Sequence, residues 1–110
     1  MPPKTPISPE KLLSLTRKLI ATDPDTTITQ LQCLLEVYLN PGELRVSDIS
    51  VRCGVTSPST TRCVDLYSDI GFKKKEGKGW LKRIPDPEDR RFKLITMTAK
   101  GTRFIDGLLS

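Results

Sequence analysis

Apolar side chains in the first 70 residues recur at helical spacing, in segments that capping residues and prolines delimit. Ser8 followed by Pro9 is typical of a helix start. This helix should end before Asp23, because a residue that precedes proline avoids the α region. The stripe that would face a core consists of Leu12, Leu13, Leu15, Leu19 and Ile20.

A second helix is predicted from Thr29, because Thr29 and Gln32 have the spacing of a capping box. Ile28 directly before it could act as a hydrophobic staple. Apolar residues then repeat at helical spacing until the Pro-Gly pair at residues 41–42 closes the helix. Residues 45–46, Arg-Val, could form a single short strand after that turn.

Residues 47–70 have the order helix, short turn, helix, which is the pattern of a helix-turn-helix unit. Ser47 opens the first helix of the pair, and Gly54 ends it. The second helix begins within Thr-Ser-Pro at residues 56–58 and is predicted to run to residue 70, with Gly71 as its C-cap. Short helix pairs are also common core pieces, so this pattern alone does not establish DNA binding.

Residues 79–98 predict a β-hairpin. The runs 80–84 and 92–97 are rich in β-formers, and the residues between them, PDPEDRR, favour a turn. Thr98 is expected to cap a last helix after the hairpin. Trp80, at the base of the hairpin, is interpreted as a core side chain rather than a surface on which a nucleic-acid base stacks.

Charge is distributed unevenly along the 110 residues. The net charge is +5, but residues 1–70 hold seven Lys and Arg against eight Asp and Glu, whereas residues 71–110 hold eleven against five. A localised basic region is typical of a protein that binds a polyanion. The alternative is a solvated lysine-rich surface that maintains solubility. Charge by itself does not decide between them.

The composition argues against several classes of protein. The chain has no His and three Cys without a C-x-x-C pair, which argues against a zinc site, another metal or cofactor, and a disulfide framework. The missing His removes the commonest general base, so an enzyme is not expected. Apolar runs are too short to span a membrane, and no leader pattern occurs at the N-terminus. We therefore expect a cytoplasmic protein, nucleoid-associated or in a host's cytoplasm if phage-encoded.

The segment DPEDRR at residues 86–91, continued by LITMTAKG at residues 94–101, resembles the MarR family of multiple antibiotic resistance regulators. It is similar to the family's D-x-R wing signature, followed by a strand and the L-T-x-x-G start of the next helix, with Met97 in place of Leu. Residues 55–65 resemble the start of the family's recognition helix, and residues 46–49 resemble the helix before it. The resemblance covers roughly residues 27–109.

The resemblance implies an α+β fold of the winged helix-turn-helix class. The expected order is helix, helix, short strand, helix, helix, strand, wing, strand, helix. Residues 1–7 would be a flexible N-terminal arm and residues 8–110 a single domain, with the helix-turn-helix at 47–70 and the wing at 79–98. The basic residues 72–78 either form an insertion before the wing or lengthen the recognition helix by up to two turns.

The recognition helix, residues 57–70, would enter the major groove, since B-DNA admits one α-helix there. Its candidate DNA-binding residues are Ser57, Ser59, Thr61 and Arg62. Arg62 is the expected base reader, because arginine pairs bidentately with guanine. The alternatives are an ordinary N-cap role for Ser57 and an ion pair of Arg62 with Asp65 or Glu36.

At the wing, the resemblance implies that Asp89 orients Arg91, which enters the minor groove. A narrow minor groove concentrates negative potential that attracts arginine. The alternative is a solvated ion-pair cluster that contributes little. The other expected contacts of this region, mostly to phosphates, are Arg90, Lys78, Lys82, Arg83 and the lysines at residues 73–75.

These features predict a protein that binds specific double-stranded DNA, most simply a transcriptional regulator. It would be a homodimer through its terminal helices that reads a near-palindrome. No membrane partner is expected, and no small-molecule effector is assigned. The alternative is a winged helix that binds a partner protein or has an architectural role, without sequence-specific DNA binding.

Overall fold

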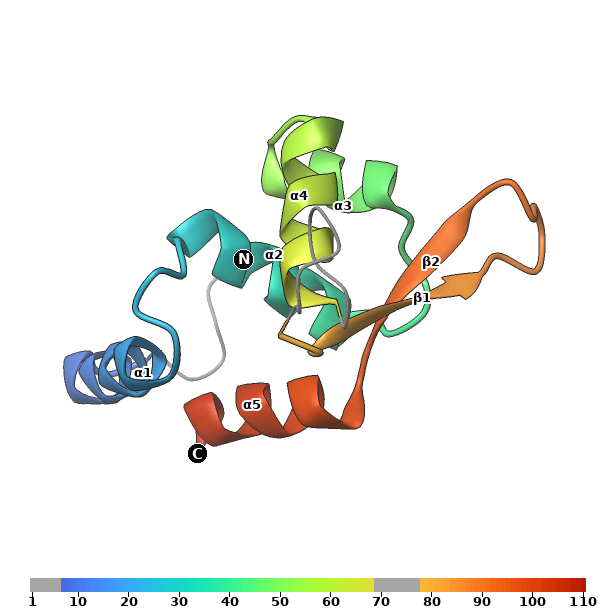
Figure 1. The fold of residues 1–110 in the computed structure, drawn as a ribbon. Coiled ribbons are helices and arrows are strands. Elements are labelled where there is room, and N and C mark those ends of the chain that lie inside the picture. Colours follow the sequence, from blue (N-terminus) through green and yellow to red (C-terminus); the bar gives the residue numbers. More distant parts are fainter. Residues whose placement is uncertain (1–6, 69–77) are drawn as a thin grey trace.

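Five helices and a two-stranded antiparallel sheet form the part of the chain that the computed structural model describes, residues 7–68 and 78–110 (Figure 1). The elements in chain order are α1 (Pro9–Thr22), α2 (Ile28–Leu39), α3 (Val46–Cys53), α4 (Ser57–Tyr67), β1 (Leu81–Pro85), β2 (Lys93–Met97) and α5 (Ala99–Leu109). The predicted flexible arm, residues 1–7, falls mostly outside the described residues, as does the predicted insertion at residues 72–78.

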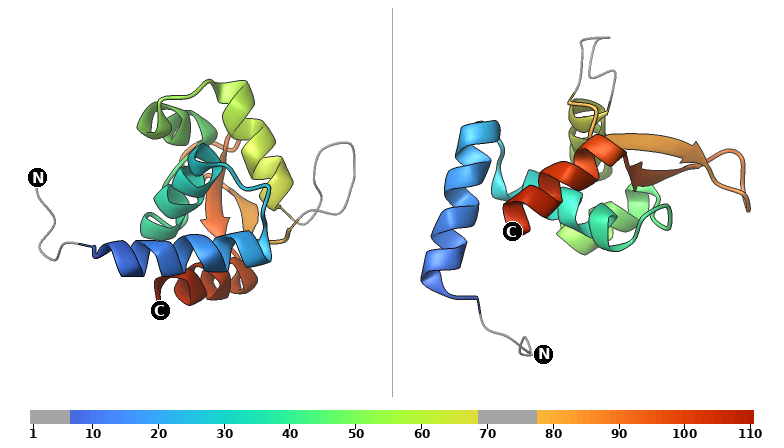
Figure 2. Two further views of the ribbon diagram at one scale, coloured as in Figure 1. Left: turned by 90° about the vertical axis from the view of Figure 1, so that its left-hand side faces the viewer. Right: turned by 90° about the horizontal axis from the view of Figure 1, so that it is seen from below.

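The hydrophobic core lies where α2, α4, the hairpin and α5 meet. Its fully buried members come from all of these elements and from α3, and the largest are Tyr67, Leu34, Ile49, Leu81, Ile95 and Ile105. Helices α3 and α4 lie at one end of the molecule, and α1 lies beside α5 at the other (Figures 1 and 2). The hairpin projects sideways from this helical body.

Capping residues fix most helix starts as the sequence predicts. The Ser8 hydroxyl accepts the N–H of Lys11 at the start of α1, and Thr98 does the same for Gly101 at the start of α5. The predicted start of α2 at Thr29 is wrong by two residues. Thr27 is the N-cap, and its capping box closes with Gln30 rather than Gln32. Ile28 is consequently the first helical residue and is exposed, not a hydrophobic staple.

The short strand predicted at residues 45–46 does not form. Leu44 alone pairs with Ile95 of β2, where its carbonyl accepts the Ile95 N–H at 2.8 Å. Arg45 then becomes the N-cap of α3, because its N–H donates to the Asp48 carboxylate at 3.0 Å. Helix α3 therefore begins at Val46, before the predicted start at Ser47, and runs to Cys53, with Gly54 as its C-cap at a left-handed φ of 67°.

Helix α4 ends at Tyr67, three residues before the predicted end at residue 70. Ser68 turns to an extended conformation and pairs with Leu81, while the carbonyl of Tyr67 accepts the Trp80 N–H at 2.7 Å. The recognition helix thus stops where its backbone pairs with the root of the hairpin. The predicted C-cap, Gly71, lies outside the described residues. At the other end the N-cap is Thr56, so Ser57 is already helical.

The predicted hairpin is present, with Leu81 opposite Met97 and Pro85 opposite Lys93. The turn between the strands closes through a hydrogen bond from the Asp86 N–H to the Phe92 carbonyl, at 3.2 Å. With α3 and α4 as the helix-turn-helix, the hairpin is the wing of a winged helix.

In the described parts of the chain, no helix combines the length and the apolar character needed to cross a membrane.

Trp80 joins the root of the wing to two helices. Its ring stacks on Tyr67 of α4 at 5.2 Å between centroids and on Phe104 of α5 at 4.0 Å. The interpretation of Trp80 as a core side chain is confirmed, since it is 5% exposed. Helix α5 approaches the Trp80 backbone so closely at Gly101 that an added Cβ would lie 2.2 Å from the Trp80 carbonyl oxygen.

This close approach predicts that Gly101→Ala destabilises the fold by about 1–3 kcal/mol, because overpacking outweighs the better helix propensity of alanine. Gly107→Ala in the same helix is the matched control, since a Cβ there meets nothing within 4 Å. It should stabilise the protein by up to about 1 kcal/mol. Urea denaturation measures both variants. Equal effects of the two substitutions would contradict the role of Gly101.

Candidate nucleic-acid interface

A buried pair of hydroxyl groups fixes the angle between α3 and α4. The Ser50 hydroxyl contacts the Thr60 hydroxyl at 2.8 Å and also reaches the Val46 carbonyl at 2.9 Å. Thr60 in turn donates to the carbonyl of Thr56 at the start of α4. Both hydroxyls therefore have hydrogen-bond partners within the protein, which makes this contact between the two helices geometrically specific.

The opposite flank of α4 is exposed and polar. The four predicted DNA-binding residues of this helix, Ser57, Ser59, Thr61 and Arg62, are all exposed. Ser57 has no cap role, because Thr56 provides the cap. The hydroxyl of Ser59 accepts a hydrogen bond from Thr56 at 3.0 Å, so it is held at the first turn of the helix. All four side chains are thus accessible, although they do not share a single narrow face of the helix.

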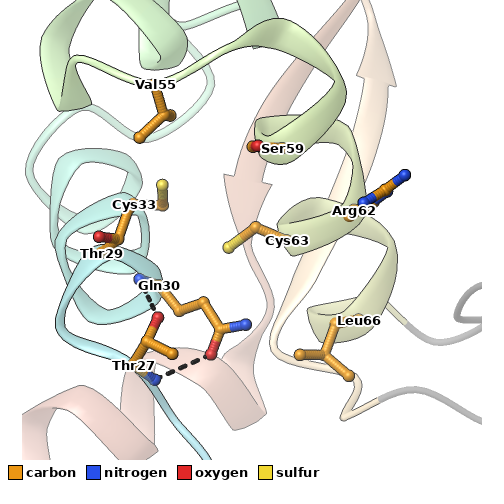
Figure 3. Close-up of a pocket in the computed structure, with 9 residues that line it drawn as sticks. All are labelled: Thr27, Thr29, Gln30, Cys33, Val55, Ser59, Arg62, Cys63 and Leu66. Atoms are coloured by element: carbon orange, nitrogen blue, oxygen red, sulfur yellow. Dashed lines mark hydrogen bonds between the residues drawn. The ribbon is translucent and has the colours of Figure 1, made fainter.

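The two acidic residues that the sequence suggested as ion-pair partners of Arg62 are bound to other arginines. Asp65 binds Arg83 of β1, and Glu36 binds Arg52 of α3 at 3.2 Å. Among the described residues, Arg62 makes no ion pair, and its guanidinium points away from α2 (Figure 3). The alternative in which Arg62 forms an ion pair with Asp65 or Glu36 is therefore wrong. Within residues 7–68 and 78–110, no acidic side chain compensates its charge.

A hollow of about 430 Å³ separates α4 from α2 behind this flank. Cys33 of α2 and Cys63 of α4 line it from opposite sides, with Arg62 and Ser59 at its margin (Figure 3). All three cysteines are free thiols. A hydrogen bond to Cys63 and burial raise the pKa of Cys33, and burial raises the pKa of Cys53 to about 12. Cys33 and Cys53 therefore stay protonated at neutral pH and are poor nucleophiles.

At the wing tip, Asp89 binds Arg91 in a bidentate pair. Arg91 Nη2 lies 2.7 Å from Asp89 Oδ2, and Arg91 Nε lies 3.0 Å from Asp89 Oδ1. This pair lowers the pKa of Asp89 and raises that of Arg91. Arg91 is nevertheless 83% exposed, so most of its donors face solvent. Arg90 beside it is exposed as well.

Asp86 anchors the wing turn to the start of α3. Its carboxylate is almost fully buried, and Oδ2 accepts from Arg45 Nε at 2.7 Å, with Nη2 of the same arginine at 2.6 Å. Its other oxygen accepts the Glu88 N–H at 2.8 Å. The bond from the Glu88 backbone, followed by that from Arg45, lowers the pKa of Asp86. The Arg45 guanidinium also lies 4.3 Å from the centre of the Phe92 ring.

The remaining predicted cations lie apart from the wing tip. Arg83 points back to α4, where it pairs with Asp65 and contacts the Ser68 hydroxyl. Lys82 is exposed on the other face of β1, as strand alternation requires. Lys78 lies 3.9 Å from Asp23, near the end of α1. The lysines at residues 73–75 lie outside the described residues.

Sequence reasoning missed Arg45 and Phe92 as parts of this surface. Arg45 was interpreted as part of a strand, and it lies 41 residues from its partner Asp86. No local spacing signals such a contact. The one usable signal was Asp86 between two prolines, a position where a carboxylate commonly bonds to the backbone of its own turn.

Residues 7–68 and 78–110 contain no cluster of three metal-ligating side chains.

The fold defines a winged helix-turn-helix protein. The chain is 29% identical over 77 residues to the multiple antibiotic resistance protein MarR of Escherichia coli, an alignment that covers 62% of this chain and 54% of MarR. The chain thus spans about half the length of the curated relatives it matches. No family model matches the sequence. The resemblance to the MarR family that the sequence indicated is confirmed.

Solved structures show the same fold. A DNA complex of MepR from S. aureus superposes with a TM-score of 0.70 at 22% identity, over 89% of this chain and 72% of that one. The transcriptional regulator Tm0710 of Thermotoga maritima gives a TM-score of 0.68 at 26% identity, over 89% of this chain and 63% of that one. The predicted α+β winged-helix class is confirmed, with Leu44 alone in place of the short strand.

The Arg45 contact predicts that the Asp86 carboxyl titrates below its ordinary pKa and that Arg45→Ala raises this pKa. Because the folded-state pKa is lowered, the stabilisation is present above the unfolded pKa and is lost as the pH falls through the folded value. Carboxylate NMR titration measures both. Arg91→Ala is the control, since it should raise the pKa of Asp89 and leave that of Asp86 unchanged. An unshifted Asp86 in the native protein would refute this assignment.

Proposed function

We propose that this protein is a transcriptional regulator that binds specific sites in double-stranded DNA. In this proposal α4 lies in the major groove and the wing reaches the adjacent minor groove. The observation that carries the proposal is Arg62, exposed on the recognition helix while its two acidic neighbours are occupied by other arginines. The existence of DNA complexes of structurally similar proteins, such as MepR, supports the same use of the fold.

In the major groove, Arg62 would read guanine through its two terminal nitrogens. The hydroxyls of Ser57, Ser59 and Thr61 would contact bases or phosphates near the helix start. The N-terminus of α4 itself favours a phosphate, because its free N–H groups and its dipole attract anions. Asp65 would not face DNA, since it is held by Arg83.

In the minor groove, Arg91 would insert while Asp89 holds its guanidinium. The bidentate pair restricts the rotamers of Arg91 before DNA binds, which lowers the entropy cost of insertion. Arg90 and Lys82 would contact phosphates, which positions the protein without reading sequence. The engaged positions of Arg83 and Lys78 favour smaller contributions from those two.

A second copy of the chain would bind through the terminal helices. No residue of α1 is buried, and several of its apolar side chains are exposed, including Leu12 at 53% and Ile20 at 62%. A hollow of about 250 Å³ between α1 and the end of α5 is lined by Ile7, Leu12, Leu15, Leu108 and Leu109 among others. Burying this apolar face in a homodimer would bring two recognition helices to half-sites about one helical turn apart.

DNA binding is tested by selecting duplexes from a random library with the native protein and measuring affinity by mobility shift at several salt concentrations. Arg62→Ala should weaken binding to the selected site by roughly 5- to 150-fold and relax selection at one base pair. Arg91→Ala should weaken it too and reduce the salt slope by about 1. Arg103→Ala on α5, at the other end of the molecule, is the matched loss of one exposed cation and should change little.

Two results would count against the proposal. Equal binding by the native protein, Arg62→Ala and Arg91→Ala would show that DNA uses another surface. Absence of any duplex binding at low salt would favour the alternative, in which the winged helix binds a partner protein.

The homodimer is tested by sedimentation equilibrium. The native protein should sediment at twice its chain mass of 12.3 kDa, and Leu12→Glu should shift it towards the monomer, because a charge would be buried at the contact. Val51→Glu is the control, since Val51 is 82% exposed on α3, away from the terminal helices. A native protein that is monomeric at micromolar concentration would exclude the dimer and the near-palindromic site.

A further inference from the structure

Arg45 is the contact between the helix-turn-helix and the wing tip. It lies at the N-terminus of α3, directly after Leu44, whose carbonyl pairs with β2. From there its guanidinium reaches both Asp86, at the start of the wing turn, and Phe92, at the end of that turn. A single side chain of the helix-turn-helix therefore contacts both sides of the turn that carries Arg91.

The contacts continue from Arg45 to Arg91 without a gap. Phe92 receives the Arg45 guanidinium at 4.3 Å and the Arg91 guanidinium at 5.7 Å from its ring centre. The Phe92 N–H donates to the Asp89 carbonyl at 3.0 Å, and the Asp89 carboxylate holds Arg91. The position of Arg91 thus depends on a turn that Arg45 contacts through Asp86 and Phe92.

The other connections of this turn are weak. The strands end at Pro85 and Lys93, so the ladder does not extend into the turn. Pro87, Glu88, Arg90 and Arg91 are all exposed. Asp86 is the buried residue of the turn, at 4% exposure, and a buried carboxylate without its cation is costly. Loss of Arg45 would therefore release the turn from α3.

We propose that Arg45 is the positioning residue of the wing: through Asp86 and Phe92 it sets the place of Arg91 relative to α4. This inference rests on the proposed DNA-binding function and adds a residue that acts through the wing rather than on DNA. It follows that the distance between the major-groove and minor-groove contacts is set by the Arg45–Asp86 pair. Lysine cannot replace arginine here, because it lacks the fork and the planar group that lies over Phe92.

The first test needs no DNA and measures backbone order in the wing turn by ¹⁵N NMR relaxation. In the native protein residues 86–92 should have order parameters near the rigid value of about 0.85, and in Arg45→Ala they should fall below about 0.6. Arg45→Lys should resemble Arg45→Ala. Arg52→Ala is the matched control, since it removes another ion-paired arginine of α3, bound to Glu36, and should leave the turn ordered.

The second test is a double-mutant cycle on the selected duplex. Arg45→Ala should weaken binding roughly tenfold in the native background and less than about twofold in the Arg91→Ala background, because coupled residues are not additive. Arg52→Ala should have the same effect in both backgrounds. If Arg45 instead contacted a phosphate directly, Arg45→Ala would cause the same loss of affinity with and without Arg91. Arg45→Lys would then keep most of the affinity, because lysine also binds phosphate.

The outcomes separate the inference from the proposed function. An ordered wing turn in Arg45→Ala, or additive losses in the cycle, overturns the positioning role. If the native protein binds no duplex at all, the proposed function fails, while the relaxation experiment still decides whether Arg45 positions Arg91.

Discussion

The stack of Tyr67, Trp80 and Phe104 is the contact on which the rest of the structure depends. It joins the end of the recognition helix, the root of the wing and the last helix in one aromatic column. Backbone bonds follow the same line, since the Trp80 N–H donates to Tyr67 and the Trp80 carbonyl accepts from Thr98. The wing cannot rotate about its root without breaking contacts to both helices.

The wing is therefore held at two levels. Its root is fixed by apolar packing, which is strong and nearly independent of pH and salt. Its tip is fixed by Arg45, Asp86 and Phe92, in which a partly exposed guanidinium contacts a buried carboxylate and an exposed aromatic ring. Such contacts are sensitive to protonation and to competing anions. The fold thus combines a rigid base with a tip whose order depends on a few charged groups.

Local patterns in the sequence predicted the helices, the hairpin and the exposed flank of α4, because caps, prolines and apolar periodicity act over a few residues. They failed where a distant partner decides. Ser68 was expected in the helix but pairs with Leu81. Arg45 was expected in a short strand but caps α3 and binds Asp86. Gly101, which reads as a helix-weakening residue, is required by the backbone of Trp80. None of these partners is within reach of a local motif.

Arg62 differs from the other arginines near the recognition helix in its contacts. Within the described residues its guanidinium stabilises no other element, whereas Arg83, Arg52 and Arg45 each hold two elements together. Replacing Arg62 should therefore leave the free energy of unfolding almost unchanged. Under the proposed function, a different side chain at this position would give a protein of equal stability that reads a different base pair. The scaffold can acquire new binding sites through this residue without first acquiring a compensating mutation.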